Sequence, residues 1–179
     1  HPKLIALYLR KTTMNQLQRI ADLNTIAGNL PIPDWTALER QCYLIELEFN
    51  EIKEAIAQQN VAKLRDAIAD VHVTAGGLGF RLGVDGEADL THVIDCLYSR
   101  FDVNEEGQKL TAEKYAKLGV DTYCHIANIV RDGIETTYYV TKVKETVYGT
   151  DGEHYPAHKW LKSVNTVSPT FDTHSVFSI

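Results

Sequence analysis

The sequence has few cysteines, no long apolar run and no excess of basic residues. Its 179 residues include three cysteines, Cys42, Cys96 and Cys124, which are widely spaced and form no CxxC pair. This spacing argues against a disulfide framework and against a zinc site, and it favours a reducing, cytoplasmic location. The early apolar run at residues 4–9 is too short to cross a bilayer, so we expect no membrane role.

The charge balance is acidic, with a net charge of -6 and a pI of about 5.6. A surface that coats duplex nucleic acid needs clustered Lys and Arg to neutralise phosphates, so we expect no duplex partner. An acidic protein can still bind a small anionic ligand if a metal ion lies between the ligand and the acidic side chains. Met14 is the only methionine, and we interpret residues 1–13 as an extension before a native start.

Helical periodicity of apolar residues predicts four helices in the first part of the chain. The predicted helices cover residues 15–26, 34–58, 61–82 and 87–101. Gly28 is a stop signal after the first helix, and Asp34 is an N-cap for the second. The joint at residues 58–60 is short, which favours antiparallel packing of the second and third helices.

The character of the sequence changes after Lys109. Residues 111–118 can form a short helix, whereas residues 120–130 and 134–147 are rich in Thr, Tyr, Val and Ile. Asp132-Gly133 between them is typical of a hairpin turn. We expect residues 149–156 to form a loop. The predicted fold is therefore mainly α. An antiparallel helical bundle occupies residues 1–105, and an α+β appendage with a small β-hairpin occupies residues 106–179.

Carboxylates interrupt the apolar stripes of the second and third predicted helices. At about 100° per residue, Glu48 lies at the centre of the apolar stripe of its helix, and Glu51 lies at the edge of that stripe. Asp66 and Asp70 share one face of the next helix, between two apolar strips. We call Glu48, Glu51, Asp66 and Asp70 the acidic seam.

Several buried carboxylates repel one another and need cations nearby. Four hard oxygen donors without a cysteine or an ExxH pair suit Mg²⁺, with Mn²⁺ as a substitute. The alternative is that Lys63 and Arg81, on the same side of the third predicted helix, neutralise the acidic seam as ion pairs without any chemistry.

The seam resembles that of the all-α nucleoside triphosphate pyrophosphohydrolases of the MazG-like type, a family that includes phosphoribosyl-ATP pyrophosphohydrolase and dimeric dUTPases. The family pattern is ExxE on one helix and ExxD on the next. Residues 48–51 (EFNE) supply the first half and residues 66–70 (DAIAD) the second, and the likeness spans residues 17–84. Ala67 stands where the pattern has Glu, and Asp66 lies one position earlier.

This resemblance implies an all-α pyrophosphatase core in which the acidic seam holds Mg²⁺. It also implies hydrolysis of a nucleoside or deoxynucleoside triphosphate to the monophosphate and pyrophosphate, with Glu48 or Glu51 accepting a proton from water. Family members bury their central helices against a second copy, which implies a homodimer or a dimer of dimers.

Two further segments, residues 99–102 (SRFD) and residues 151–163 (DGEHYPAHKWLKS), are similar to segments of a phage and bacterial branch of this family. The similarity implies that Arg100, Lys159 and Lys162 contact substrate phosphates. The alternative is that these three are solvated surface groups.

Two other functions remain open from the sequence. One is a non-catalytic helical oligomerisation module that binds a metal or a nucleotide. The other is a phosphoribosyl-ATP pyrophosphohydrolase, which the additional C-terminal β region disfavours because that family is shorter.

Overall fold

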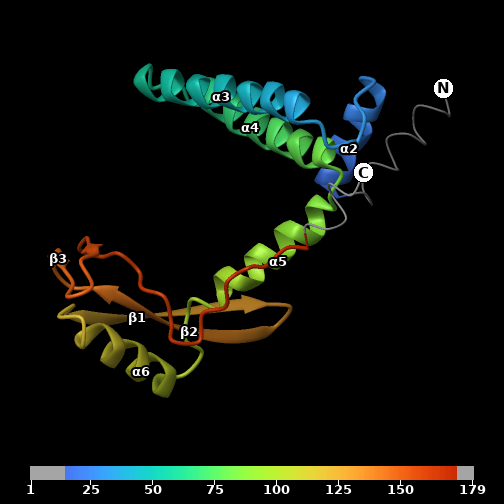
Figure 1. Ribbon diagram of the computed structural model, residues 1–179. Helices are drawn as coiled ribbons and strands as arrows, with labels where there is room; N and C mark the ends of the chain where they lie inside the picture. Colours follow the sequence, from blue (N-terminus) through green and yellow to red (C-terminus); the bar gives the residue numbers. More distant parts are fainter. Residues whose placement is uncertain (1–14, 173–179) are drawn as a thin grey trace. The chain divides into compact units, whose positions relative to one another are not determined.

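The computed structural model describes residues 15–172, which form five α-helices and two small two-stranded antiparallel sheets (Figure 1). Residues 15–90 and 171–172 belong to one compact unit, and residues 91–170 to a second. The predicted boundary between a core and an appendage after residue 105 stays a prediction. The interpretation of residues 1–13 as an extension lies outside the described residues.

The first unit contains α2 (Gln16–Ile26), α3 (Trp35–Ala57) and α4 (Val61–Leu82), and the next helix, α5 (Gly86–Tyr98), begins within it. Each of the first three helices starts at a polar N-cap, where a side-chain oxygen accepts a hydrogen bond from a backbone N–H of the first turn. The caps are Asn15, Asp34 and Asn60. These three helix predictions are confirmed to within about two residues.

Helices α3 and α4 lie side by side, and the short link at residues 58–60 joins them (Figure 1). Helix α2 packs against α4 at Gly76, where an added Cβ would lie 3.0 Å from Cδ1 of Ile20. An alanine there would require the Ile20 and Leu17 side chains to shift by a few tenths of an ångström. The mainly α class is confirmed, whereas a complete antiparallel bundle stays a prediction.

The second unit contains α6 (Glu105–Ala116), a long hairpin of β1 (Thr122–Arg131) and β2 (Ile134–Val143), and a short ribbon of β3 (Val147–Tyr148) and β4 (His154–Tyr155). The hairpin prediction is confirmed. Arg131 pairs with Ile134 across a two-residue turn. Asp132 and Gly133 have φ of 51° and 77° there, as a type I′ turn requires.

Two local predictions in this unit were wrong. Helix α6 begins six residues before the predicted start at residue 111, because Asn104 caps it by accepting from the Gly107 N–H at 2.8 Å. Residues 149–156 were predicted as loop but include β4.

A compact apolar core joins α6 to the strands of the second unit. Its buried members are Tyr115, Val120, Val143, Tyr155 and Leu161. Helix α6 contacts both strands of the hairpin (Figure 1). The segment after β4 is thereby held against β2.

Candidate functional site

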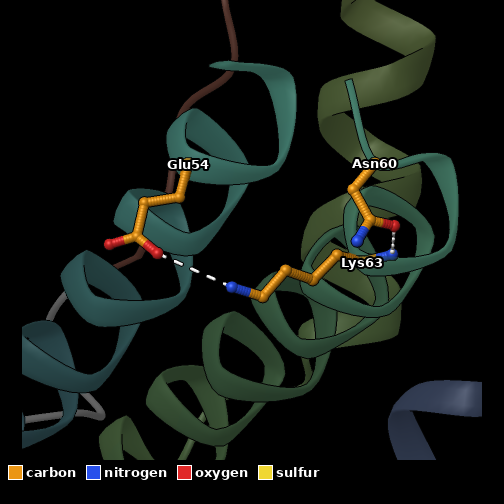
Figure 2. Close-up of polar contacts among 3 residues, drawn as sticks. All are labelled: Glu54, Asn60 and Lys63. Carbon is orange, nitrogen blue, oxygen red and sulfur yellow. Dashed lines mark hydrogen bonds and ion pairs between the residues drawn. The ribbon is translucent and has the colours of Figure 1, made fainter. Parts of the chain in front are cut away.

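Two contacts define the register of α3 against α4. Lys63 Nζ lies 3.6 Å from Glu54 Oε2, beside the Asn60 cap that accepts from the Lys63 N–H (Figure 2). Further along the pair, Gln41 Nε2 donates to the Thr74 carbonyl at 3.0 Å. Helices α3 and α4 are therefore antiparallel, and residues earlier in α3 lie beside residues later in α4.

This register places the acidic seam on facing levels of the two helices. Glu51 precedes Glu54 by three residues on α3, and Asp66 follows Lys63 by three residues on α4. One turn further along, Glu48 lies at the level of Asp70. The facing pairs are thus Glu51 with Asp66 and Glu48 with Asp70.

The other three acids of the seam act electrostatically on Glu48. Partial burial raises the pKa of Glu48 above its usual 4.5, and the charges of Asp70, Glu51 and Asp66 raise it further. Glu48 and Asp70 are half-buried. Glu51 and Asp66 are exposed in the single chain, so the expectation of a fully buried seam is wrong for these two.

The ion-pair alternative for the acidic seam is wrong. Lys63 pairs with Glu54, which lies outside the seam, and the two side chains are 42% and 62% exposed. Arg81 donates from Nε to Gln41 Oε1 at 3.1 Å and from Nη2 to Asn29 Oδ1 at 2.6 Å. Within residues 15–172, neither base forms an ion pair with an acid of the seam.

The donor set fits a hard divalent cation in its chemistry but is not preassembled. Four carboxylates from two facing helices are the ligand type that Mg²⁺ and Mn²⁺ prefer. In the part of the chain that the structure describes, no three acidic, histidine or cysteine side chains form a ready coordination group. Mutual repulsion disfavours a closed cluster of carboxylates, so binding an ion would require side-chain rotations.

A buried amide network beside the seam was missed by the sequence analysis. Gln41 is 6% exposed and joins Thr74 to Arg81, and Arg81 reaches Asn29. Asn29 in turn donates to Asn24 Oδ1 at 2.9 Å. The signal was present, because the helical wheel places Gln41 about 20° from Glu48, on the inward stripe.

The three predicted phosphate-binding residues lie together in the second unit. Arg100, Lys159 and Lys162 line one pocket of about 290 Å³, together with Trp160 and Tyr155. The structure therefore brings together side chains that lie about sixty residues apart in the chain. Their predicted contact with phosphate stays a prediction.

None of the helices in residues 15–172 has the combined length and apolar character needed to cross a membrane. Comparison of the chain with protein-family models, curated proteins and solved structures finds no match. The resemblance to MazG-like proteins therefore depends on sequence segments alone, those of the acidic seam and, more loosely, residues 99–102 and 151–163.

Proposed function

We propose that this protein hydrolyses a nucleoside or deoxynucleoside triphosphate to the monophosphate and pyrophosphate in a reaction that depends on Mg²⁺. One observation carries the proposal. Residues 48–51 and 66–70 resemble the two halves of the MazG-like pattern, and the α3–α4 register sets their acids on facing levels. Acids at facing levels of two neighbouring helices could share one divalent ion.

Glu48, Glu51, Asp66 and Asp70 would hold Mg²⁺ or Mn²⁺. Bound there, the ion would neutralise phosphate charge and lower the barrier to attack by water. Glu48 or Glu51, whichever is not fully committed to the ion, would accept the proton of the attacking water.

A second copy of the chain is part of the proposal. Large apolar side chains of α3 and α4 are exposed in the single chain, among them Tyr43, Leu47, Phe49, Ile56 and Ile68. Covering them in a homodimer, or in a dimer of dimers, would remove apolar surface from water. It would also reduce the exposure of the seam. Light scattering that gives a strict monomer would count against this assembly.

We also propose a cytoplasmic location, in keeping with the three free thiols Cys42, Cys96 and Cys124. Burial raises the pKa of the Cys124 thiol, which keeps it protonated and poorly nucleophilic. A catalytic role for this cysteine is therefore not part of the mechanism.

The test is pyrophosphate release from a panel of nucleoside and deoxynucleoside triphosphates with Mg²⁺. Glu51→Gln should lower turnover at least about a hundredfold while circular dichroism shows unchanged helix content. Glu46→Gln is the matched control, because Glu46 is an exposed acid on the same helix. Unchanged turnover in Glu51→Gln would remove Glu51 from the site.

The same panel separates the alternatives. A non-catalytic module would bind a nucleotide without releasing pyrophosphate. Phosphoribosyl-ATP belongs in the panel. Its selective hydrolysis would favour a phosphoribosyl-ATP pyrophosphohydrolase over an enzyme that acts on nucleoside triphosphates.

A further inference from the structure

The pocket of the second unit is built around a contact between two distant segments. The Ser163 N–H donates to the Arg100 carbonyl at 3.1 Å, and Ser163 Oγ donates to Asp102 Oδ1 at 2.5 Å. Asp102 and Ser163 are each 2% exposed. These bonds hold the Arg100 backbone beside that of Lys162, so the two cationic side chains start from a rigid base.

The β2 strand fixes the other side of the pocket. The Leu161 N–H donates to the Thr141 carbonyl at 2.8 Å, and the Val143 N–H donates to the Lys159 carbonyl at 2.9 Å. Residues 159–161 thus lie along the edge of β2 that β1 does not occupy. Lys159 and Lys162 are presented from an ordered segment rather than from a loose loop.

The charge of the pocket lining favours an anion. Three cations line it with one carboxylate, that of Glu153. In the described part of the chain the ion pairs join Lys63 to Glu54 and Lys144 to Asp121, so no lining cation belongs to one. A guanidinium with two ammonium groups is a suitable partner for the several oxygens of a phosphate.

An exposed indole supplies a surface for a flat ring. Trp160 lines the pocket and is 48% exposed, although it is one of the largest apolar side chains of the unit. One of its faces stacks on Phe101, with ring centroids 5.1 Å apart and planes 21° apart. This stacking fixes the orientation of the indole, and aromatic side chains held in this way bind nucleobases.

We propose that this pocket binds a single nucleotide, with Arg100, Lys159 and Lys162 on its phosphate and Trp160 against its base. Its volume of about 290 Å³ suits a small ligand rather than a nucleic-acid strand. The pocket lies wholly within residues 91–170 and uses no acid of the seam. Binding here depends on neither the divalent ion nor the proposed hydrolysis.

Trp160 provides the readout. The chain has two tryptophans, so the Trp35→Phe variant leaves Trp160 as the only indole. In that background, with a chelator present, a nucleoside monophosphate should change the fluorescence of Trp160 with a saturating curve. The same nucleoside without its phosphate, and inorganic pyrophosphate without a base, should each bind more weakly.

Charge variants identify the pocket. Lys159→Ala and Lys162→Ala should each weaken binding of the nucleoside monophosphate about tenfold, as expected for loss of one charge-assisted contact. Lys109→Ala, an exposed lysine of α6 outside the pocket lining, should leave the affinity unchanged. Glu48→Gln should also leave it unchanged, although that variant is expected to lose hydrolysis.

Two results would overturn the proposal. One is the absence of saturable binding at millimolar nucleotide, and the other is equal affinity in the two lysine variants and the control. Pyrophosphate that binds as tightly as the nucleotide would rule out the base contact. Hydrolysis without binding at this pocket would support the proposed function and contradict the nucleotide pocket. Binding without hydrolysis would support the nucleotide pocket and contradict the proposed function.

Discussion

Arg81 Nε donates a hydrogen bond to Gln41 Oε1 at 3.1 Å, across the contact between α4 and α3. The amide of Gln41 also donates to the Thr74 carbonyl at 3.0 Å, so both ends of this side chain are engaged. Because the side chain is buried, loss of either partner would leave a polar group without compensation. The helix pair that carries the acidic seam is therefore held in register by a polar contact as well as by apolar packing.

Gly77 is the position that makes room for this amide. A Cβ added there would lie 2.9 Å from Gln41 Nε2 and 3.3 Å from Asn24 Nδ2. Gly77→Ala should therefore destabilise the chain by about 1–3 kcal/mol in chemical denaturation, because the buried amide must give up its partners. This loss should exceed the gain of about 1 kcal/mol that alanine brings to a helix interior.

Gly79→Ala is the matched control on the same helix. A Cβ at Gly79 would meet only Val84 Cγ2, at 4.0 Å, so the helix gain should appear without a penalty. We expect a stabilisation of about 0.5–1 kcal/mol. Equal effects at Gly77 and Gly79 would contradict the assigned role of the Gln41 amide.

The helices were predictable because their ends carry local signals. Asn15, Asp34 and Asn60 lie immediately before apolar periodic runs, and each caps a helix. Of these caps, only Asp34 was predicted as one. The predicted start of α6, at Thr111, lies six residues too late. Its true cap, Asn104, precedes a polar first turn.

The candidate sites were only partly predictable. A helical wheel gives the direction of Glu48 and Asp70 but not what covers them, so it could not reveal that Asp66 is exposed. The pocket with Arg100 and Lys162 depends on a backbone contact between segments about sixty residues apart. No local periodicity encodes such a contact.

The raised pKa of Glu48 predicts how stability depends on pH in the presence of a chelator. The folded chain binds this proton more tightly than the unfolded chain, so the contribution is present below pH 4.5 and is lost as pH rises through the raised pKa. Glu48→Gln should therefore be more stable than the parent at neutral pH, with the difference fading in acid. Thermal unfolding across this range measures it, with Glu46→Gln as the control.

Mg²⁺ should stabilise the parent more than the Glu48→Gln variant. An ion that binds the folded seam stabilises the parent by about 1.4 kcal/mol at ten times its dissociation constant. Glu48→Gln has lost a ligand, so its midpoint of unfolding should rise less on addition of Mg²⁺. Identical shifts in parent and variant would place the ion elsewhere.

Asp151 and Tyr155 form a second titrating pair, in the ribbon of the second unit. Tyr155 donates from its hydroxyl to Asp151 Oδ2 at 2.7 Å, which raises the pKa of Tyr155 to about 12 and lowers that of Asp151. Stabilisation from the phenol is present below pH 10 and is lost as pH rises through about 12. Stabilisation from the carboxylate is present above pH 3.8 and is lost as pH falls through its lowered pKa.

Asp151→Asn tests this pair directly. Without the neighbouring charge, the pKa of Tyr155 should move from about 12 toward its ordinary value of 10. An ultraviolet difference titration of tyrosinate should then show one more phenol ionising at the lower pH. Glu153→Gln is a fitting comparison, because Glu153 is the weakest of the influences that raise the pKa of Tyr155. A titration unchanged by Asp151→Asn would mean that the hydrogen bond does not persist in solution.

Ser163 is expected to act as a positioning residue for the nucleotide pocket. Its buried hydroxyl donates to Asp102 and accepts from the Asn165 N–H at 3.0 Å. Ser163→Ala should cost about 1–3 kcal/mol of stability, because the carboxylate of Asp102 loses its donor in a buried site. Nucleotide affinity should fall as well, because the backbone segments that carry Arg100 and Lys162 would no longer be held in fixed positions.

A conservative variant distinguishes positioning from general destabilisation. Ser163→Thr keeps the hydroxyl and should recover most of the nucleotide affinity, even if the added methyl group lowers stability. Thr150→Ala, which removes an exposed hydroxyl in the same unit, should change neither quantity by more than about 0.5 kcal/mol. Affinity that follows stability alone across these three variants would contradict a positioning role, because a hydroxyl that orients the two cations must matter even where the fold is intact.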